Sequence, residues 1–385
     1  MMSKRKRESL PKSFIVVLGI TLSAVTTAHS VDVPVKSPKP PLNQPVAKQD
    51  PGEWKRVVEA AKKEGKVVLP GDPSEVWRRS LVDLFQEEYP EIKVEYTGMN
   101  GRDFLPRLKQ ERALGKKLWD LVSSGTTTAY GVRTNGFLDP IRLLLVNENA
   151  ENDKWIGGLD GLFSDKEKRF VCSYTIVAEP TTFVNRDFIK ETELKSSQQL
   201  LDPMFKGKIV MQTPTAGATF TALGSLGLMY GENFLRDLLS KQNVVVTDDK
   251  RQQTEWLVRG RHPIAIGFTN TQLIPFKKQG LGKNIATLED KYIPLSTGLG
   301  SISLLKDAPH PHAGRVYINW LLSQKTQIRL TRNVLLNSRR TDVPAVVKEL
   351  MVDPAQLDRY FNFGNEENKE KIARLLPVIK EALQK

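Results

Sequence analysis

Strand-forming segments alternate with helix-forming segments through the first third of the chain, and this alternation constrains the fold most strongly. Apolar, strand-like runs begin at Lys66, Lys93 and Leu118, so successive starts lie 27 and 25 residues apart. Each gap contains a helical pattern; the apolar residues of 75–88, for example, fall on one face of a helix. Strands joined through helices at this spacing form βαβ units with parallel neighbours. The pattern therefore predicts an α/β fold built on parallel sheets.

A second series of strand-like and helix-like segments follows in the middle of the chain. Strands are expected at 208–212, 243–247 and 264–268, and helices at about 217–230 and 249–260. A long extended run from Lys168 to Asn185 joins the two series. Because 385 residues exceed what one compact core usually holds, two domains are expected.

The first 30 residues have the pattern of a secretory signal peptide. A basic start precedes the apolar stretch Phe14–Ala28, and Ala28-His29-Ser30 fits a small-x-small cleavage site, so cleavage is expected near Ser30. The apolar stretch is shorter than the ~20 residues that span a bilayer, although a retained anchor is the alternative. Residues 31–51 form a Pro-rich, extended leader. The chain is therefore expected to be exported.

Charge and cysteine content exclude several classes of protein. The formal net charge is +13, but part of it lies in the signal segment, and the other basic residues are scattered along helical patterns. Solvated helix faces explain that distribution, so no nucleic-acid partner is predicted. Cys172 is the only cysteine and lies in a strand-like run, which excludes an internal disulfide and predicts a buried thiol.

Sequence motifs for catalysis and for metal binding are missing. The chain has no G-x-S-x-G, phosphate-binding loop or H-E-x-x-H segment. His310 and His312 flank a proline, His262 is isolated, and no third ligand stands at the spacing of a zinc site. We therefore predict no enzyme, no resident metal and no cofactor, and keep a secreted α/β enzyme as an alternative.

Three segments from different parts of the chain resemble one family. Residues 301–327 combine a strand, a turn marked by Pro309 and a helix that closes in Leu-Leu-Ser-x-x-x-Gln. The opening Trp-x-x-Val-Val-x-Ala-Ala-Lys-Lys-Glu-Gly-Lys-Val-Val, from Trp54 to Val68, is the second segment, and 253–267 is the third. Together they resemble periplasmic solute-binding proteins of ABC importers, in the subgroup that contains ferric-ion, thiamine and aminophosphonate binders.

This resemblance implies a type II periplasmic-binding-protein-like fold, with two α/β lobes, a hinge and an interlobe cleft. The first lobe would comprise 52–173 and 298–385, and the second lobe 174–297. The helical patterns at 346–351 and 369–383 would pack on the first lobe. The resemblance also implies a small-molecule ligand, an ABC permease in the inner membrane as partner, and a periplasmic monomer.

Four loops that follow strands supply the candidate binding residues. The carboxyl ends of parallel strands collect at one sheet edge, where loops lead into helix N-termini that hold polar or anionic groups. The candidates are Asp72, Ser74, Ser124, Thr126, Thr215, Thr219, Phe268 and Asn270. Because two loops come from each expected lobe, we predict that they meet around a small polar solute, and we favour an anionic one.

Two further candidates lie outside these loops. Arg251 stands in the first turn of a helix, where a cation is poorly placed unless it pairs with an anion, although a solvated surface arginine is the alternative. Tyr174 lies beside the expected hinge and would close over a ligand, unless it simply packs there. The resemblance leaves a ferric or other metal binder as an alternative. The paired tyrosines that ferric members use are missing around 268–272.

Overall fold

The computed structural model describes residues 51–214 and 217–384. The expected signal peptide with its cleavage site near Ser30, the leader up to residue 50, and Thr215 lie outside the described residues.

The first series of elements forms as the spacing predicts, with two differences. Strands β1 (Lys66–Gly71) and β2 (Lys93–Gly98) pair in parallel, with Val67 opposite Val94. The helix expected at 75–88 is two helices, α2 (Glu75–Leu81) and α3 (Asp83–Glu88), which meet at Val82. The third strand, β3 (Leu121–Ser124), begins later than expected.

The strand that returns from the second series changes the direction of pairing. β13 (Ser301–Leu305) pairs antiparallel with β3, with β4 (Leu138–Asp139) and with β5 (Cys172–Ser173). The parallel sheet expected for the first series forms between β1 and β2, whereas β3 pairs antiparallel with β13, because spacing along the chain cannot show a strand that returns from a distant segment. Cys172 is buried, as expected.

The second series forms a separate five-stranded sheet in the order β11-β7-β10-β8-β9. Its strands are β7 (Thr182–Asn185), β8 (Ile209–Met211), β9 (Val245–Val246), β10 (Ile264–Ile266) and β11 (Ile285–Thr287). β8 is parallel to β9 and β10, whereas β7 is antiparallel to β10 and β11. The first and the second series of elements have separate apolar cores.

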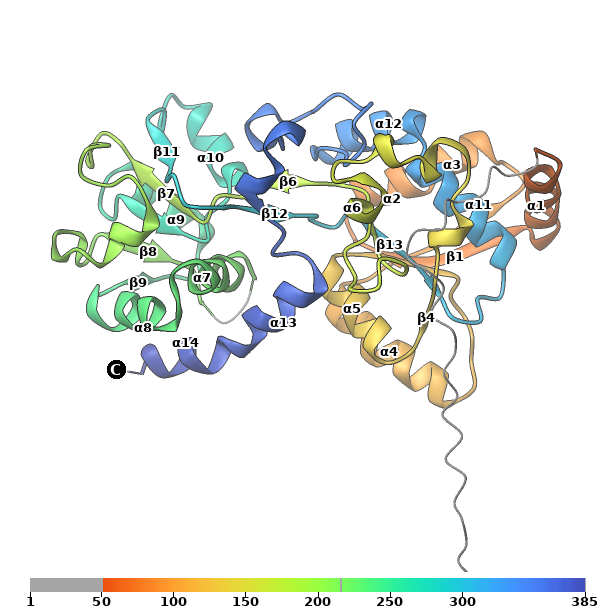
Figure 1. The fold of residues 1–385 in the computed structure, drawn as a ribbon, viewed down its shortest axis with the longest axis horizontal. Coiled ribbons are helices and arrows are strands. Elements are labelled where there is room, and N and C mark those ends of the chain that lie inside the picture. Colours follow the sequence, from red (N-terminus) through yellow and green to blue (C-terminus); the bar gives the residue numbers. More distant parts are fainter. Residues whose placement is uncertain (1–50, 215–216, 385) are drawn as a thin grey trace, which may run out of the picture. The chain divides into compact units, whose positions relative to one another are not determined.

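A small three-stranded sheet joins the two series (Figure 1). β12 (Ile293–Ser296) pairs antiparallel with β6 (Val177–Ala178) and parallel with β14 (Tyr360–Phe361). Ile176, Ala178, Leu295 and Val352 form a buried cluster beside it. Three segments far apart in the sequence are thus tied together by backbone hydrogen bonds.

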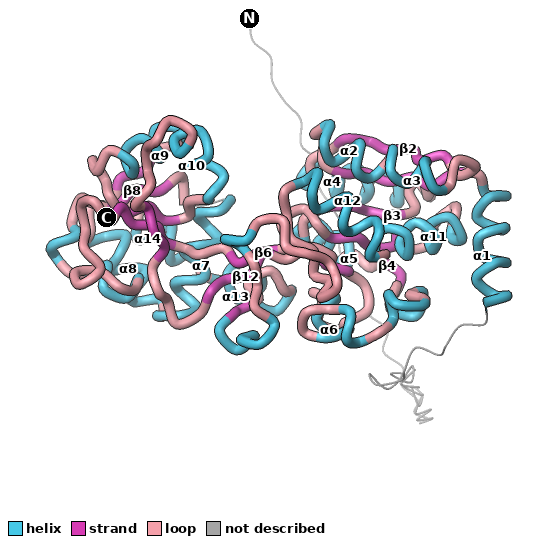
Figure 2. The backbone as a smooth tube through the Cα atoms, turned by 90° about the horizontal axis from the view of Figure 1, so that it is seen from above, coloured by secondary structure: helices cyan, strands magenta, loops and turns pink. Residues whose placement is uncertain are grey.

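The remaining elements are mostly helices that cover the sheets. The helices are α1 (Pro51–Glu64), α4 (Gly101–Ala113), α5 (Thr126–Thr134), α6 (Gly158–Leu162), α7 (Gly217–Tyr230), α8 (Glu232–Lys241), α9 (Lys250–Val258), α10 (Asn270–Lys277), α11 (Pro311–Leu322), α12 (Gln324–Val334), α13 (Glu366–Arg374) and α14 (Leu376–Ala382). Short 3-10 turns span Arg142–Leu144, Asn147–Ala150, Asn152–Lys154, Ser197–Leu201, Pro203–Phe205, Lys348–Leu350 and Pro354–Arg359. α1, α3 and α12 pack against α11, and α2 packs against α12 (Figure 2).

The last two helices do not lie where the sequence analysis placed them. α14 packs against α8, and Leu375, Ile379 and Ala382 belong to the apolar core of the second sheet. Arg236 of α8 forms an ion pair with Glu381. The expectation that the C-terminal helices pack on the first lobe is therefore wrong for α14. An amphipathic pattern shows that a helix has a buried face but not which core receives it.

Replacing Ile379 by Ala should destabilise the protein by about 2–4 kcal/mol, because its side chain is fully buried in the second core. Chemical denaturation measures the change in the free energy of unfolding. Lys380→Ala, an exposed neighbour on the same helix, should change it by less than about 0.5 kcal/mol. Equal effects of the two substitutions would contradict the packing of α14.

Asp120 fixes the junction between β1, β3 and α11. Its fully buried carboxylate accepts hydrogen bonds from the backbone N–H of Val68 (2.8 Å) and of His310 (2.7 Å). The ring Nδ1 of His310 lies 2.9 Å from the same carboxylate. His310 thus has a structural role at the start of α11.

Asp120→Ala should cost about 3 kcal/mol of stability, because two part-buried N–H groups lose their acceptor and the His310 ring loses its partner. The exposed Asp358→Ala is the matched control. Thermal unfolding followed by circular dichroism checks both, and a loss below about 1 kcal/mol for Asp120→Ala would refute the role given to this carboxylate.

Candidate ligand-binding site

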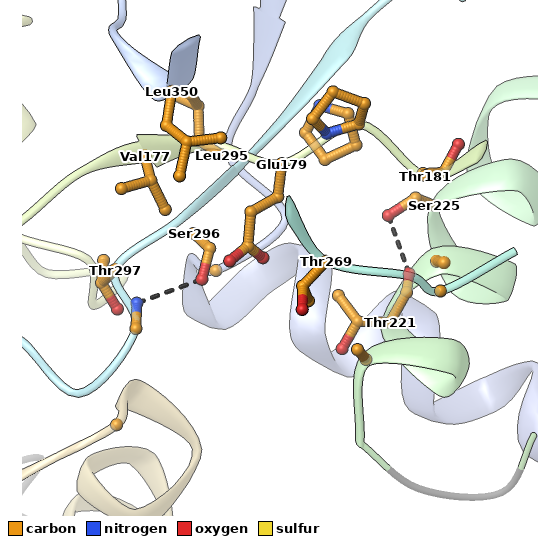
Figure 3. A pocket seen from close by; sticks show the side chains of 18 of the residues that line it. Val177, Glu179, Thr181, Thr221, Ser225, Thr269, Leu295, Ser296, Thr297 and Leu350 are labelled. Carbon is orange, nitrogen blue, oxygen red and sulfur yellow. Dashed lines mark hydrogen bonds between the residues drawn. The ribbon is translucent and has the colours of Figure 1, made fainter. Parts of the chain in front are cut away.

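A cavity of about 360 Å³ lies where α5, α7, the β10–α10 loop and the small joining sheet meet. Its walls include Gly125 and Thr126 at the start of α5, Ala218 and Thr221 in α7, and residues 267–269 before α10. The joining sheet and the residues that follow its strands contribute Val177, 179–181 and 294–298 (Figure 3). The cavity is therefore built from both series of elements.

Hydroxyl groups make up much of the polar wall. They come from Thr126, Thr127, Thr181, Thr221, Ser225, Thr269, Ser296 and Thr297. Some are held in place by the backbone: the Ser225 hydroxyl donates to the Thr221 carbonyl (2.8 Å), and the Ser296 hydroxyl accepts from the N–H of Gly298 (3.1 Å). Since a hydroxyl both donates and accepts, this wall suits a polar solute.

Helix N-termini also meet at the cavity. α5 begins directly after Gly125, which has no side chain to cap the first N–H groups. α10 follows Thr269, and the early residues of α7 line the same space. The first turn of a helix leaves backbone N–H groups without helical partners and carries partial positive charge, which favours an anionic group.

One carboxylate and one ammonium group face this cavity, Glu179 and Lys369. Burial among protein atoms raises the pKa of Glu179, while the Ser296 hydroxyl and the positive charge of Lys369 oppose that shift. Burial lowers the pKa of Lys369, and Glu179 opposes it. The Glu179 side chain is nevertheless accessible, because the space in front of it is the cavity itself (Figure 3).

The opposite side of the cavity is apolar. Val177, Leu295, Leu335, Leu336 and Leu350 line it. Leu335 is 61% exposed and has a left-handed backbone (φ 54°) at the end of α12, an unusual conformation for a branched residue. Most small-molecule sites combine an apolar wall with a few polar groups in a volume of ~300–1,000 Å³. This cavity has the size and composition for an organic solute.

The structure places five of the predicted loop residues in or beside this cavity. Thr126 and Phe268 line it. Ser124 lies directly before the lining residue Gly125. Thr219 lies between the lining residues Ala218 and Thr221, and its buried hydroxyl has no hydrogen-bond partner. Asn270 begins α10, directly after the lining residue Thr269.

Four other candidates lie elsewhere, and Thr215 is outside the described residues. The Asp72 carboxylate accepts from the N–H of Ser74 (2.9 Å) in the loop before α2, away from the residues that line the cavity. Arg251 is exposed at the start of α9, where Asp249 caps the helix. Tyr174 is fully buried in the first core, so its position matches a packed hinge aromatic.

The two charged residues of the cavity, Glu179 and Lys369, and several of its hydroxyl-bearing residues were not among those predicted from the sequence. Glu179 had a signal that could have revealed it, because a carboxylate follows a long buried run and precedes Pro180. Lys369 had none, since it stands in a helix whose pattern is that of a charged surface. Ser296 is the last residue of β12 and carries no motif.

The structure offers no clustered metal ligands in its described part. Among those residues, no three His, Cys, Asp or Glu side chains come together as a metal site would require. None of the residues that line the cavity is a tyrosine or a histidine. Nor does any described helix have the length and hydrophobicity needed to span a bilayer.

Known structures share this fold. A Trichodesmium protein, IdiA or FutA, solved with iron and citrate, has a TM-score of 0.65 and 16% identity, over 83% of this chain and 100% of that chain. The periplasmic binding protein AfuA from Actinobacillus pleuropneumoniae, with fructose-6-phosphate bound, has a TM-score of 0.53 and 17% identity, over 82% of this chain and 99% of that chain. The expected fold class is confirmed: a type II periplasmic-binding-protein fold, with two α/β lobes, a hinge and a cleft.

The family follows from the sequence. The family model for bacterial extracellular solute-binding proteins matches residues 70–328, and the chain belongs to this family. The family binds solutes for transport and is not a family of enzymes. An uncharacterized Haemophilus influenzae protein is 29% identical over 145 residues, which are 36% of this chain. The match spans 40% of the length of that curated relative.

Glu179→Gln should stabilise the unliganded protein at pH 7–8, by at most about 1 kcal/mol because part of the carboxylate faces solvent. A raised pKa in the folded state means that ionisation of Glu179 opposes folding as the pH rises through that pKa. The difference between variant and parent should therefore shrink towards pH 4, where both side chains are neutral. Thermal unfolding midpoints at pH 4, 6 and 8 measure it, and a stabilisation that grows at low pH would contradict it.

Proposed function

We propose that this protein is the substrate-binding component of an ABC importer, which captures a small polar, anionic solute and delivers it to a membrane permease. The observation that carries the proposal is the cavity where the starts of α5, α7 and α10 meet around a hydroxyl-rich wall. Because this space is lined from both series of elements, a solute there contacts both lobes. A solute that makes more contacts in the closed form shifts the population towards closure.

The proposed hinge lies in the joining sheet. We propose that the chain passes from the first lobe to the second near residue 174 and returns near residue 297, as the sequence suggested. Residues 174–297 then form most of the second lobe. The first lobe takes 52–173 and the chain from 298 through α12, and α14 counts with the second lobe because of its packing on α8. The β6–β12 pairing would flex while the two larger sheets move as units.

Localisation and partners complete the proposal. The signal pattern of residues 1–30, with cleavage near Ser30, supports release into the periplasm, and a retained anchor is the alternative. The monomeric state is what the family resemblance implies. The partner that follows from the family is an ABC permease in the inner membrane. No nucleic acid and no resident cofactor are needed for this function.

Ferric binding is the second candidate function, because the Trichodesmium structure was solved with iron and citrate. The cavity here has one carboxylate, no tyrosine and an apolar wall, so iron would need ligands from a bound organic anion. When ferric citrate is added to the protein, we expect the visible spectrum to be the same as that of ferric citrate alone. A new absorption band, lost on chelation, would favour the iron function.

The main proposal is tested by thermal shift of the purified mature chain against a library of small carboxylates, phosphates, phosphonates and sugar phosphates. A solute at 100 times its Kd should stabilise the protein by about 2.7 kcal/mol, which raises the unfolding midpoint by several degrees. The absence of a shift with every solute would overturn the proposal.

Lys369→Met should raise the Kd of the tightest-binding anionic solute by about 10–100-fold, because a partly buried ammonium group contributes a charged contact. The control is Lys380→Met on the exposed face of α14, which should leave Kd within twofold. Isothermal titration calorimetry gives both values. An unchanged Kd in Lys369→Met would place the solute outside this cavity.

A further inference from the structure

Glu179 is placed by the backbone of the joining sheet. Its N–H donates to the carbonyl of Pro294 (2.8 Å), immediately beyond the pairing of Ala178 with Leu295. The following residue, Pro180, restricts the backbone further. Figure 3 shows the carboxylate directed into the cavity, near Ser296 and Thr269. Its position therefore does not depend on a flexible loop.

Lys369 is held from a different direction. Glu366, one turn earlier in α13, forms an ion pair with Arg133 of α5. Ile372, one turn later, packs so closely on Gly224 of α7 that a Cβ on that glycine would lie 2.4 Å from the isoleucine side chain. The ammonium group thus faces the cavity from a helix that is fixed to both α5 and α7.

These two opposite charges do not neutralise each other by direct contact. Within the part of the chain that the structure describes, neither Glu179 nor Lys369 forms an ion pair. Burial opposes the charged form of each, as their pKa shifts show. Glu179 is open to the cavity and Lys369 is half-buried at its wall, so a bound molecule that carries both complementary charges would pair both groups at once.

We infer that the solute is a zwitterion with an apolar carbon skeleton, whose protonated amine sits on Glu179 and whose anionic group faces Lys369 and the helix N-termini. This rests on the proposed function and revises its substrate class, from a simple anion to a solute that also carries a positive charge. An anion alone would leave Glu179 unpaired and would be repelled by it. The apolar wall of Leu295, Leu335, Leu336 and Leu350 gives the skeleton a surface that a bare phosphonate or metal ion would not use.

The test uses matched sets of probes on the mature chain. One set is L-leucine, 4-methylpentanoate (which lacks the amine) and 3-methylbutylamine (which lacks the carboxylate). The second is L-phenylalanine, 3-phenylpropanoate and 2-phenylethylamine, and any further solute found in the library is compared with its own deaminated analogue. The inference predicts that the zwitterion binds at least tenfold more tightly than either partner, measured by calorimetry at pH 7.

Glu179→Gln separates recognition of the amine from a general effect on folding. It should weaken binding of the zwitterion at least tenfold. Binding of the deaminated analogue should stay unchanged or become tighter, because the repulsion between its anionic group and Glu179 is removed. The control is Glu191→Gln, an exposed carboxylate in a turn outside the cavity, which should change neither. If Glu179→Gln does not fold, Glu179→Asp, whose carboxylate is one methylene shorter, should show the same selective loss.

The possible results distinguish a failure of the zwitterion inference from a failure of the proposed solute-binding function. A tight solute without a cationic nitrogen, or equal binding of an acid and its amine-bearing analogue, overturns the zwitterion while the binding function stands. Unchanged zwitterion affinity in a folded Glu179→Gln also overturns it. The absence of binding by every probe and every library solute overturns the binding function, and the inference with it.

Discussion

The backbone pairing of β6 with β12 is the interaction on which the rest of the site depends. It joins the segment that leaves the first series to the segment that returns from the second, with Leu295 opposite Ala178 and Ser296 opposite Val177. Val177, Leu295 and Ser296 of these two strands all line one cavity, so the pairing brings apolar and polar groups to the same space.

The same pairing explains how the walls of the cavity can be rigid while the two lobes move relative to each other. Each large sheet has its own buried core, while the joining sheet is narrow, with two residues in β6 and two in β14. Few backbone hydrogen bonds resist a rotation there, whereas the cores resist internal change. Polar groups from the two series can therefore approach a solute without any rearrangement of the packing that positions them.

Elements with strong periodicity could be predicted from the sequence, and long-range partners could not. The alternation of 66–98 predicted β1 and β2, and helix α7 has the bounds expected, because local patterns determine local structure. The antiparallel return of β13 and the packing of α14 depend on contacts between segments far apart in the chain. Within the site, Thr126 and Phe268 were predicted because they follow strands, whereas Lys369 comes from a helix outside any strand–loop pattern.

The position of α14 has a consequence for the independence of the two lobes. Leu375, Ile379 and Ala382 cover the second core, although β13, α11 and α12 of the first series separate them along the chain from the other residues of that core. Without α14, an apolar face of α8 would have no cover. The second lobe therefore completes its core only with a segment that follows the return to the first lobe, so excision of 174–297 alone would not yield an autonomous folding unit.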